Sequence, residues 1–341
     1  MKYHLLGPSG LRVTELCLGT MTFGEDWGWG ADKATSQKIF DVFTEAGGNF
    51  IDTSNNYTNG TSEKFVGEFI KRERDRFVVA TKYTLRLSTG STNDANLGGN
   101  SRKSMMRSVE NSLRRLDTEY IDLLYLHMWD FTTPVEEVLH AASDLINSGK
   151  VMYFAFSDTP AWIVSSALAK AEAFGFHRPI ALQIPYSLLD RTVERAEIPM
   201  ARANNLGVLA WGILKDGILT GKYSQPSSEP RRESKVGGKE LEVGSAIVAI
   251  AKEIECTPAQ VAIQWLRQQP GKIIPILGCR TETQIKDNLG CLKLFLNEEH
   301  MARLNTMADF NLGFPYSFLH SKHIRDLIFG NTFELLDASL Q

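Results

Sequence analysis

Four residues of this chain have side chains that could together give a proton to a carbonyl oxygen: Asp52, Tyr57, Lys82 and His127. A tyrosine hydroxyl has an ordinary pKa of about 10, which is too high for easy donation at neutral pH. A neighbouring lysine ammonium lowers that pKa, and a carboxylate keeps the lysine charged. A histidine can orient the substrate oxygen or relay the proton. These residues lack a hydride source, so a reductase built on them needs a cofactor.

Three of these residues end successive strand-like runs, and Tyr57 lies five residues after Asp52. Apolar runs of this kind alternate with helical segments along the whole chain, which predicts parallel strands joined by helices. Eight such units favour a single-domain (β/α)8 TIM barrel over residues 1–341, because its strand ends meet at one mouth. A doubly wound sheet is the alternative, but no GxGxxG motif follows the first strand. The predicted strands are Leu16–Gly19, Asn49–Asp52, Phe77–Lys82, Ile121–His127, Val151–Phe156, Ile180–Ile184, Gly207–Trp211 and Lys272–Leu277.

Helices are predicted between these strands from apolar periodicity and capping residues. Capping hydroxyls are expected at Thr133, Thr159, Thr257 and Thr281, the first three before a proline. Residues 212–244 form a long interruption, which is usual for functional or mobile loops. The predicted helices are Ser36–Ala46, Ser62–Lys71, Ser101–Leu116, Val135–Asn147, Ala161–Phe174, Ala196–Asn205 and Pro258–Gln268.

The two ends of the chain carry additional elements. A Gly-Pro turn at Gly7-Pro8 between two short extended runs predicts an N-terminal β-hairpin. A C-terminal helical extension is expected over residues 308–341. Its apolar side chains, among them Phe310, Phe314 and Phe318, must pack on the barrel or on a partner subunit.

Composition places the chain among ordinary globular proteins and excludes several classes of function. Its 341 residues are 43% hydrophobic and 23% charged, with a formal net charge of −3. That charge gives no case for nucleic-acid binding, and no apolar run approaches the ~20 residues that span a bilayer. The four cysteines are scattered without metal-ligand spacing, which predicts no metal site and a reducing, cytoplasmic location. The protein is expected to be a monomer or a homo-oligomer.

Three motifs around the four residues match a known pattern. Phe50–Tyr57 followed by Thr61-Ser62-Glu63 is similar to the signature D-T-A-x-x-Y-G-x-x-x-S-E, and Ala80-Thr81-Lys82 and Tyr120–His127 are similar to the strands that follow it. The chain, from Leu5 to Met307, resembles the aldo-keto reductase superfamily, in particular its aryl-alcohol-dehydrogenase-like members. The resemblance implies a (β/α)8 barrel that binds NADPH without a Rossmann motif. It also implies that the catalytic tetrad is Asp52, Tyr57, Lys82 and His127.

The same resemblance implies where the cofactor binds. Asp158 departs from the usual asparagine, and its carboxylate can accept from the nicotinamide NH₂ group but cannot donate to the carboxamide oxygen. Gly212 replaces a serine, so a pyrophosphate-binding hydroxyl is missing. Arg280 suits a 2′-phosphate, which favours NADPH over NADH. The implied contacts are Gly19, Thr20, Met21 and Asp52; Ser157, Asp158 and Gln183 for the carboxamide; Trp211 for ring stacking; Gly212, Ile213, Leu214, Gly217 and Lys222 for the pyrophosphate; and Gly278, Arg280, Gln284, Asp287 and Asn288 for the 2′-phosphate end.

The expected reaction is the reduction of an aldehyde or ketone to the alcohol, with hydride from NADPH and a proton from Tyr57. Aromatic residues predicted at the mouth favour a substrate with an aromatic or apolar body, and these are Phe23, Trp27, Trp29 and Trp129. Two alternatives remain open. A strand-end lysine also serves Schiff-base lyases, here through Lys82. A nucleotide-sensing subunit, similar to the barrel-shaped β subunits of potassium channels, would keep the same four residues.

Overall fold

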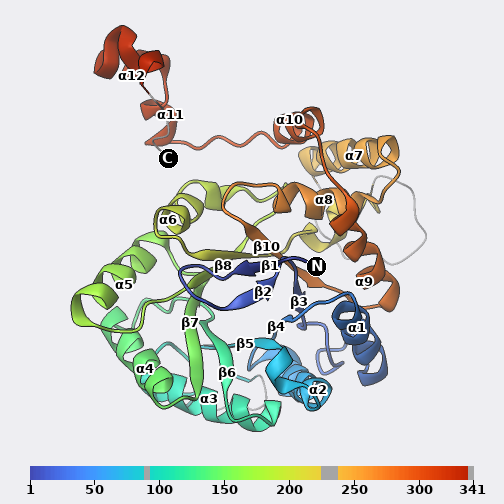
Figure 1. Ribbon diagram of the computed structural model, residues 1–341, viewed down its shortest axis with the longest axis vertical. Helices are drawn as coiled ribbons and strands as arrows, with labels where there is room; N and C mark the ends of the chain where they lie inside the picture. The colour runs from blue at the N-terminus through green and yellow to red at the C-terminus, as the bar shows by residue number, and fades with distance from the viewer. Residues whose placement is uncertain (88–92, 224–236, 337–341) are drawn as a thin grey trace.

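The computed structural model shows a closed barrel of eight parallel strands surrounded by helices (Figure 1). It describes residues 1–87, 93–223 and 237–336. Each strand pairs with the next along the chain, and the last pairs with the first. All eight predicted strands are present, with ends that differ by at most one residue. The strands are β3 (Cys17–Gly19), β4 (Phe50–Asp52), β5 (Val78–Tyr83), β6 (Ile121–Leu126), β7 (Val151–Ser157), β8 (Ala181–Pro185), β9 (Gly207–Trp211) and β10 (Ile273–Gly278).

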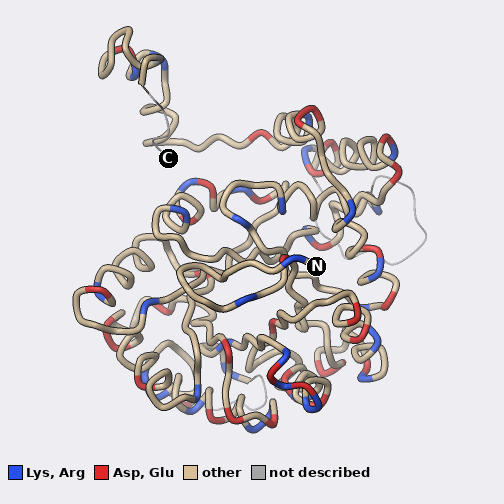
Figure 2. The backbone as a smooth tube through the Cα atoms, viewed as in Figure 1, with Lys and Arg blue, Asp and Glu red and all other residues tan. Residues whose placement is uncertain are grey.

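The helices that surround the barrel include the seven that periodicity predicts. The helix Gly238–Glu253 was not predicted and occupies part of the expected interruption, of which residues 224–236 lie outside the described part of the chain. Acidic and basic residues alternate over these outer helices (Figure 2). The helices are α1 (Lys33–Glu45), α2 (Thr61–Ile70), α3 (Arg102–Leu116), α4 (Val135–Asn147), α5 (Ala161–Phe174), α6 (Glu197–Ala203), α7 (Gly238–Glu253), α8 (Pro258–Arg267), α9 (Glu282–Leu289) and α10 (Glu298–Met307).

Two of the four predicted capping hydroxyls are confirmed. Thr257 and Thr281 accept the backbone N–H three residues later, at the starts of α8 and α9. The predicted caps at Thr133 and Thr159 are wrong, because the helices there begin after a proline with no side-chain cap. Thr133 instead donates its hydroxyl to Asp130, at 2.9 Å, and so closes the turn that precedes α4.

The hydrophobic core has two layers, one between the strands and the helices and one inside the barrel. The inner layer is small, and it contains Phe50, Leu123, Tyr125 and Ile276. The predicted N-terminal hairpin pairs β1 (Tyr3–Leu5) with β2 (Arg12–Thr14), and its buried residues Leu6 and Val13 complete this layer. In Figure 1 the hairpin lies across the centre of the barrel and closes that end.

The hairpin turn approaches the barrel backbone very closely. Gly7 has a φ of +57°, and a Cβ placed there would lie 2.0 Å from the carbonyl oxygen of Ile180 and 2.9 Å from the nitrogen of Gly207. A Cβ placed at Gly207 would in turn lie 2.5 Å from Leu6 Cδ1 and 3.1 Å from the nitrogen of Gly7. Only glycine combines this left-handed conformation with such an approach. The opposite end of the barrel, where the strands end, is therefore the one that can be open.

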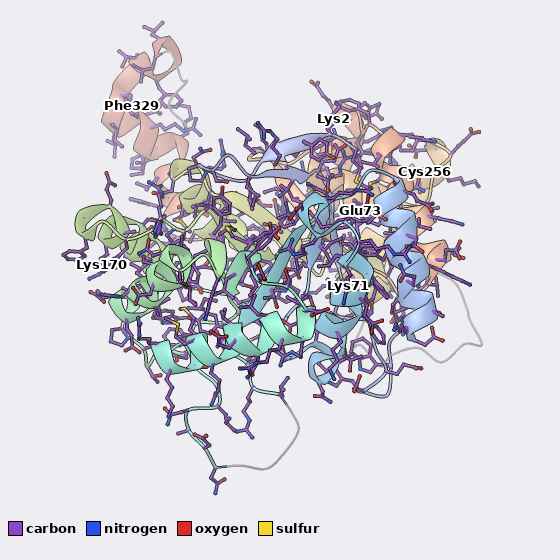
Figure 3. All side chains as sticks on the ribbon, turned by 60° about the horizontal axis from the view of Figure 1, so that its bottom comes forward. Lys2, Lys71, Glu73, Lys170, Cys256 and Phe329 are labelled. Carbon is purple, nitrogen blue, oxygen red and sulfur yellow. The ribbon has the colours of Figure 1, made fainter. Side chains whose placement is uncertain are left out.

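The C-terminal extension contains two further helices, α11 (Tyr316–Leu319) and α12 (Lys322–Phe329). It runs away from the barrel in Figure 1, and Figure 3 shows Phe329 at its outer end. Phe314 is 84% exposed and Leu327 is 69% exposed. The first tail residues do contact the barrel, since Ala308 is buried in the core and the Arg195 guanidinium lies 4.6 Å from the centre of the Phe310 ring. Packing on a partner subunit stays a prediction, and residues 337–341 lie outside the described part.

No helix within residues 1–87, 93–223 or 237–336 combines the length and the apolar character that a membrane span requires.

Candidate active site

The four candidate catalytic residues meet at the carboxyl ends of three neighbouring strands. Asp52 is the last residue of β4, Lys82 lies one residue before the end of β5, and His127 directly follows β6. Tyr57 begins a 3-10 turn, η1 (Tyr57–Gly60), which connects β4 to α2. Since the strands are parallel and in sequence order, their ends lie side by side at one mouth.

Lys82 is the centre of the site, and each proton of its ammonium has an acceptor within reach. Its Nζ donates to Asp52 Oδ1 at 2.5 Å, to the Thr53 carbonyl oxygen at 2.8 Å and to the Tyr57 hydroxyl at 3.1 Å. Lys82 is completely buried and Asp52 is 2% exposed. Gln183 donates to the second carboxylate oxygen of Asp52 at 2.9 Å. The charge pair is therefore fixed by hydrogen bonds on both sides.

Burial and charge oppose one another at this pair. Burial lowers the pKa of Lys82, but Asp52 and Tyr57 together outweigh burial, so the pKa of Lys82 is raised. Burial raises the pKa of Tyr57, and the opposing effect of the Lys82 ammonium is smaller. The expected lowering of the Tyr57 pKa is thus wrong for the protein alone, because the hydroxyl is withdrawn from water. Tyr57 keeps its proton at neutral pH, and Lys82 lies where it stabilises the phenolate that forms when the proton leaves.

His127 is held next to Tyr57 as a neutral ring. Burial, together with the nearby Lys82 ammonium, lowers the pKa of His127 to about 3. The two rings meet edge to face, with centroids 5.9 Å apart. His127 Nδ1 lies 3.1 Å from the hydroxyl of Ser54, which also donates to Asn56 Oδ1 at 2.8 Å. Sequence reasoning missed Ser54, although the serine stands where the quoted signature has alanine.

Several residues near the mouth have left-handed backbone conformations that are uncommon outside glycine. Thr58 and Asn59 follow Tyr57 with φ of 43° and 54°, Thr84 follows β5 with φ of 98°, and Asp158 follows β7 with φ of 39°. Such conformations cost about 1–3 kcal/mol each and gather at functional sites. Their grouping after strand ends supports a functional assignment of this end of the barrel.

The residues expected to hold a carboxamide lie at the ends of β7, β8 and β9. The hydroxyl of Ser157 is buried without a hydrogen-bond partner within the described structure. Asp158 Oδ1 accepts from the indole nitrogen of Trp211 at 3.1 Å, and Trp211 is 41% exposed. Gln183 has its amide nitrogen engaged by Asp52. An unpartnered buried hydroxyl at the end of β7 and an exposed indole at the end of β9 are suited to an aromatic amide such as nicotinamide.

The segment after β9 combines buried and strained positions. Gly212 has a φ of +68° with open space where a side chain would be, and Ile213 is buried. Leu214 packs partly buried against the core. The turn η4 (Lys215–Thr220) follows, in which Gly217 has a φ of +83°. The ammonium of Lys222 lies over this glycine, 2.6 Å from where its Cβ would be.

The segment after β10 presents one cation beside a helix start. Arg280 is exposed, and its backbone N–H donates to Gln284 Oε1 at 2.8 Å. The next residue caps α9, whose N-terminus favours anions. The side chain of Asp287 accepts from Thr257 and Gln260 on α8, and Asn288 donates to Cys279 Sγ. Gly278 has open space at its Cβ position.

The segment after β3 contains both buried residues and residues that are partly exposed. Gly19 and Thr20 are buried against neighbouring strands, and Thr20 donates to the Asp52 carbonyl oxygen at 2.9 Å. Met21 is 43% exposed. Trp27 lies edge to face with Tyr57, at 6.4 Å between centroids, and packs against Trp29 at 5.6 Å.

The other two aromatic residues predicted in the substrate pocket, Phe23 and Trp129, differ in burial. Phe23 is fully buried and packs on Phe69, so its side chain does not reach the mouth, and the structure removes it from the predicted substrate pocket. Trp129 is partly buried, and its backbone N–H donates to the carbonyl oxygen of Asp158 at 3.3 Å.

Comparisons with known proteins identify the family of the chain. The model of the aldo/keto reductase family matches residues 15–309. An aryl-alcohol dehydrogenase of Pestalotiopsis microspora is 37% identical over 328 residues, covering 93% of this chain and 85% of that protein. Norsolorinic acid reductase A of Aspergillus parasiticus is 38% identical over 93% of this chain and 84% of its own length. An NADP(+) aryl-alcohol dehydrogenase of Phanerodontia chrysosporium is 38% identical over 92% and 88%, respectively. The chain therefore belongs to the aldo/keto reductase family and is an oxidoreductase.

Proposed function

We propose that this protein reduces an aldehyde or ketone with an aromatic or apolar body to the alcohol, using NADPH. The observation that carries the proposal is the hydrogen bond from the buried Lys82 ammonium to the Tyr57 hydroxyl. It gives the chain a protonated phenol next to a fixed positive charge at the open end of the barrel. When bound, NADPH supplies the hydride that the carbonyl carbon receives.

Each residue has a distinct role in this reaction. Tyr57 gives its proton to the carbonyl oxygen, and Lys82 stabilises the phenolate that remains. Asp52 keeps Lys82 charged and in place through the contact at 2.5 Å. Because the donors and charges are already fixed by hydrogen bonds, they need little rearrangement as charge develops. His127 forms a neutral wall beside Tyr57 and positions the substrate against it.

The residues at the other strand ends fit the proposed cofactor. Ser157 offers a buried hydroxyl for the carboxamide, and Trp211 offers an exposed ring face for the nicotinamide. Arg280, at the start of α9, offers a guanidinium for the 2′-phosphate. The name of the Phanerodontia relative specifies NADP(+), which adds support for this choice of cofactor.

Support for an aromatic substrate comes from two directions. Trp27 lies against Tyr57, and Trp29 lies against Trp27, so indole rings border the hydroxyl that gives the proton. The relatives are named for aryl alcohols and for norsolorinic acid. We infer that the substrate carbonyl is attached to an aryl group that packs on these indoles.

The test of the proposal is a Tyr57→Phe variant assayed with NADPH and a panel of aryl aldehydes and ketones. Losing the general acid should lower kcat by about 10²- to 10⁴-fold. The dissociation constant for NADPH, measured by tryptophan fluorescence quenching, should stay within about twofold of the wild-type value. Reduction at the wild-type rate by this variant would show that another group provides the proton.

The Schiff-base alternative has little support in the geometry. An amine attacks a carbonyl only after it loses a proton, and the pKa of Lys82 is raised by Asp52 despite burial. Borohydride added with substrate should therefore trap no adduct on Lys82. The channel-subunit alternative predicts a stable complex with a membrane partner and negligible turnover, so the same substrate panel separates it from the reductase.

A further inference from the structure

Asp158 sets the charge of the open end of the barrel. Besides burial, the charged side chains that shift the pKa of Tyr57 are Lys82, Asp52 and Asp158. Lys82 and Asp52 form an ion pair at 2.5 Å and largely cancel one another. Tyr57 and His127 are neutral at pH 7. The ionised carboxylate of Asp158 therefore leaves this group of residues with a net charge of one negative unit.

The surroundings of Asp158 fix its position without neutralising it. Its backbone N–H donates to the Gln183 carbonyl oxygen at 3.1 Å, and its Oδ1 accepts from Trp211 Nε1 at 3.1 Å. Trp211 is an uncharged donor, and within the described residues Asp158 forms no ion pair. Burial raises the pKa of Asp158 to about 6, against the hydrogen bond from Trp211 and the charge of Lys82. The carboxylate is mostly ionised at neutral pH.

We propose that Asp158 makes the site bind NADP⁺ in preference to NADPH. The nicotinamide ring is cationic in the oxidised cofactor and neutral in the reduced one, whereas the rest of the molecule is unchanged. The inference rests on the proposed function, because hydride transfer requires the ring to lie beside a carbonyl carbon whose oxygen contacts Tyr57. Trp211, the indole proposed to stack on the nicotinamide, donates to Asp158 Oδ1 at 3.1 Å, so the ring lies within the field of this carboxylate.

The size of the preference follows from the charges. Two opposite unit charges about 10 Å apart, at an effective dielectric constant of about 20, attract enough to change a binding constant roughly tenfold. Because tighter binding of the oxidised form stabilises the products of carbonyl reduction, the same attraction favours the reductive direction on the protein. In that direction the carbonyl carbon receives the hydride, and its oxygen takes the proton that Tyr57 carries at neutral pH. An asparagine at this position would lack the attraction.

The preference should depend on pH in one direction. Lys82 faces Asp158 from β5, Tyr57 faces it from η1, and the uncharged Trp211 faces it from β9. As the pH falls through about 6, Asp158 gains a proton and its attraction for the cationic ring is lost. Affinity for NADP⁺ should then fall relative to that for NADPH. The 2′-phosphate also titrates near pH 6, but both forms carry it, so the ratio of their dissociation constants cancels its effect.

The experiment measures dissociation constants of NADP⁺ and NADPH at pH 7.5 and 5.5 by isothermal titration calorimetry. The proteins are the wild type, Asp158→Asn and Asp117→Asn. Asp117 is a matched control, because it also has a left-handed backbone (φ 49°) but ends α3, which leads into the opposite end of the barrel. At pH 7.5, Asp158→Asn should weaken NADP⁺ roughly tenfold, leave NADPH within about twofold, and remove the pH dependence of the ratio.

Asp117→Asn should match the wild type in all four measurements. Equal changes for both cofactor forms in Asp158→Asn, or no change in either, would overturn the proposal. A wild type that binds neither form refutes the proposed function instead, so the two failures are distinct.

Discussion

Replacing Lys82 with methionine tests whether the buried charge pair stabilises the whole fold. Methionine keeps most of the side-chain length but removes the ammonium, so Asp52, 2% exposed, retains Gln183 as its side-chain donor. Removing one partner of a buried pair costs about 3–5 kcal/mol, because the remaining charge is uncompensated. We expect Lys82→Met to lower the free energy of unfolding by about that amount.

The assay is urea unfolding at pH 7, followed by the fluorescence of the six tryptophans. Lys71→Met is the control, because Lys71, which is labelled in Figure 3, forms an exposed ion pair with Asp117. The unfolding midpoint of this variant should not change. The double variant Lys82→Met with Asp52→Asn has no buried charge and should recover much of the lost stability. If the double variant loses as much unfolding free energy as the two single variants lose together, the reasoning is refuted.

Two further predictions concern the neighbouring site and the closed end of the barrel. In wild-type protein, His127 should carry its proton on Nδ1 and not titrate between pH 5 and 9, because the Ser54 hydrogen goes to Asn56 Oδ1 and the pKa of His127 is about 3. Imidazole ¹⁵N shifts should show this tautomer and its partial loss in Ser54→Ala; an unchanged tautomer contradicts the assignment. Gly7→Ala should cost at least about 2 kcal/mol of unfolding free energy, since its Cβ would lie 2.0 Å from a carbonyl oxygen. Gly10→Ala, with open space around its Cβ, is the control in the same urea assay, and equal losses would exclude the steric explanation.

The barrel and the proximity of the four residues could be predicted from sequence, because both follow from the periodicity of apolar residues and the order of the strands along the chain. Apolar runs separated by helical segments specify parallel strands, and parallel strands place their ends together. Asp52 and Lys82 end neighbouring strands, so their contact follows from topology alone. The residue types then limit the chemistry to a small number of reactions.

The features that sequence reasoning missed depend on tertiary packing, on competing hydrogen-bond partners and on burial. The helix α7 was missed because Gly238 and Gly244 weaken its helical signal, although it packs against α8 and α10 in the folded chain. Thr133 reads as a cap, yet a nearby carboxylate takes its hydroxyl. The pKa of Tyr57 depends on burial, which spacing in the sequence does not reveal.

The hairpin that closes the barrel also affects how the chain reaches its native state. Gly7 packs on Ile180 and Gly207, which the ribosome makes much later, so the hairpin is among the last segments to settle. Contacts so distant in sequence are slow to form, since the intervening chain must first be ordered. Until then the inner apolar layer stays accessible from that end, and at about 5–20 residues per second this interval lasts many seconds. Nascent chains should therefore depend on chaperones until the later strands have emerged.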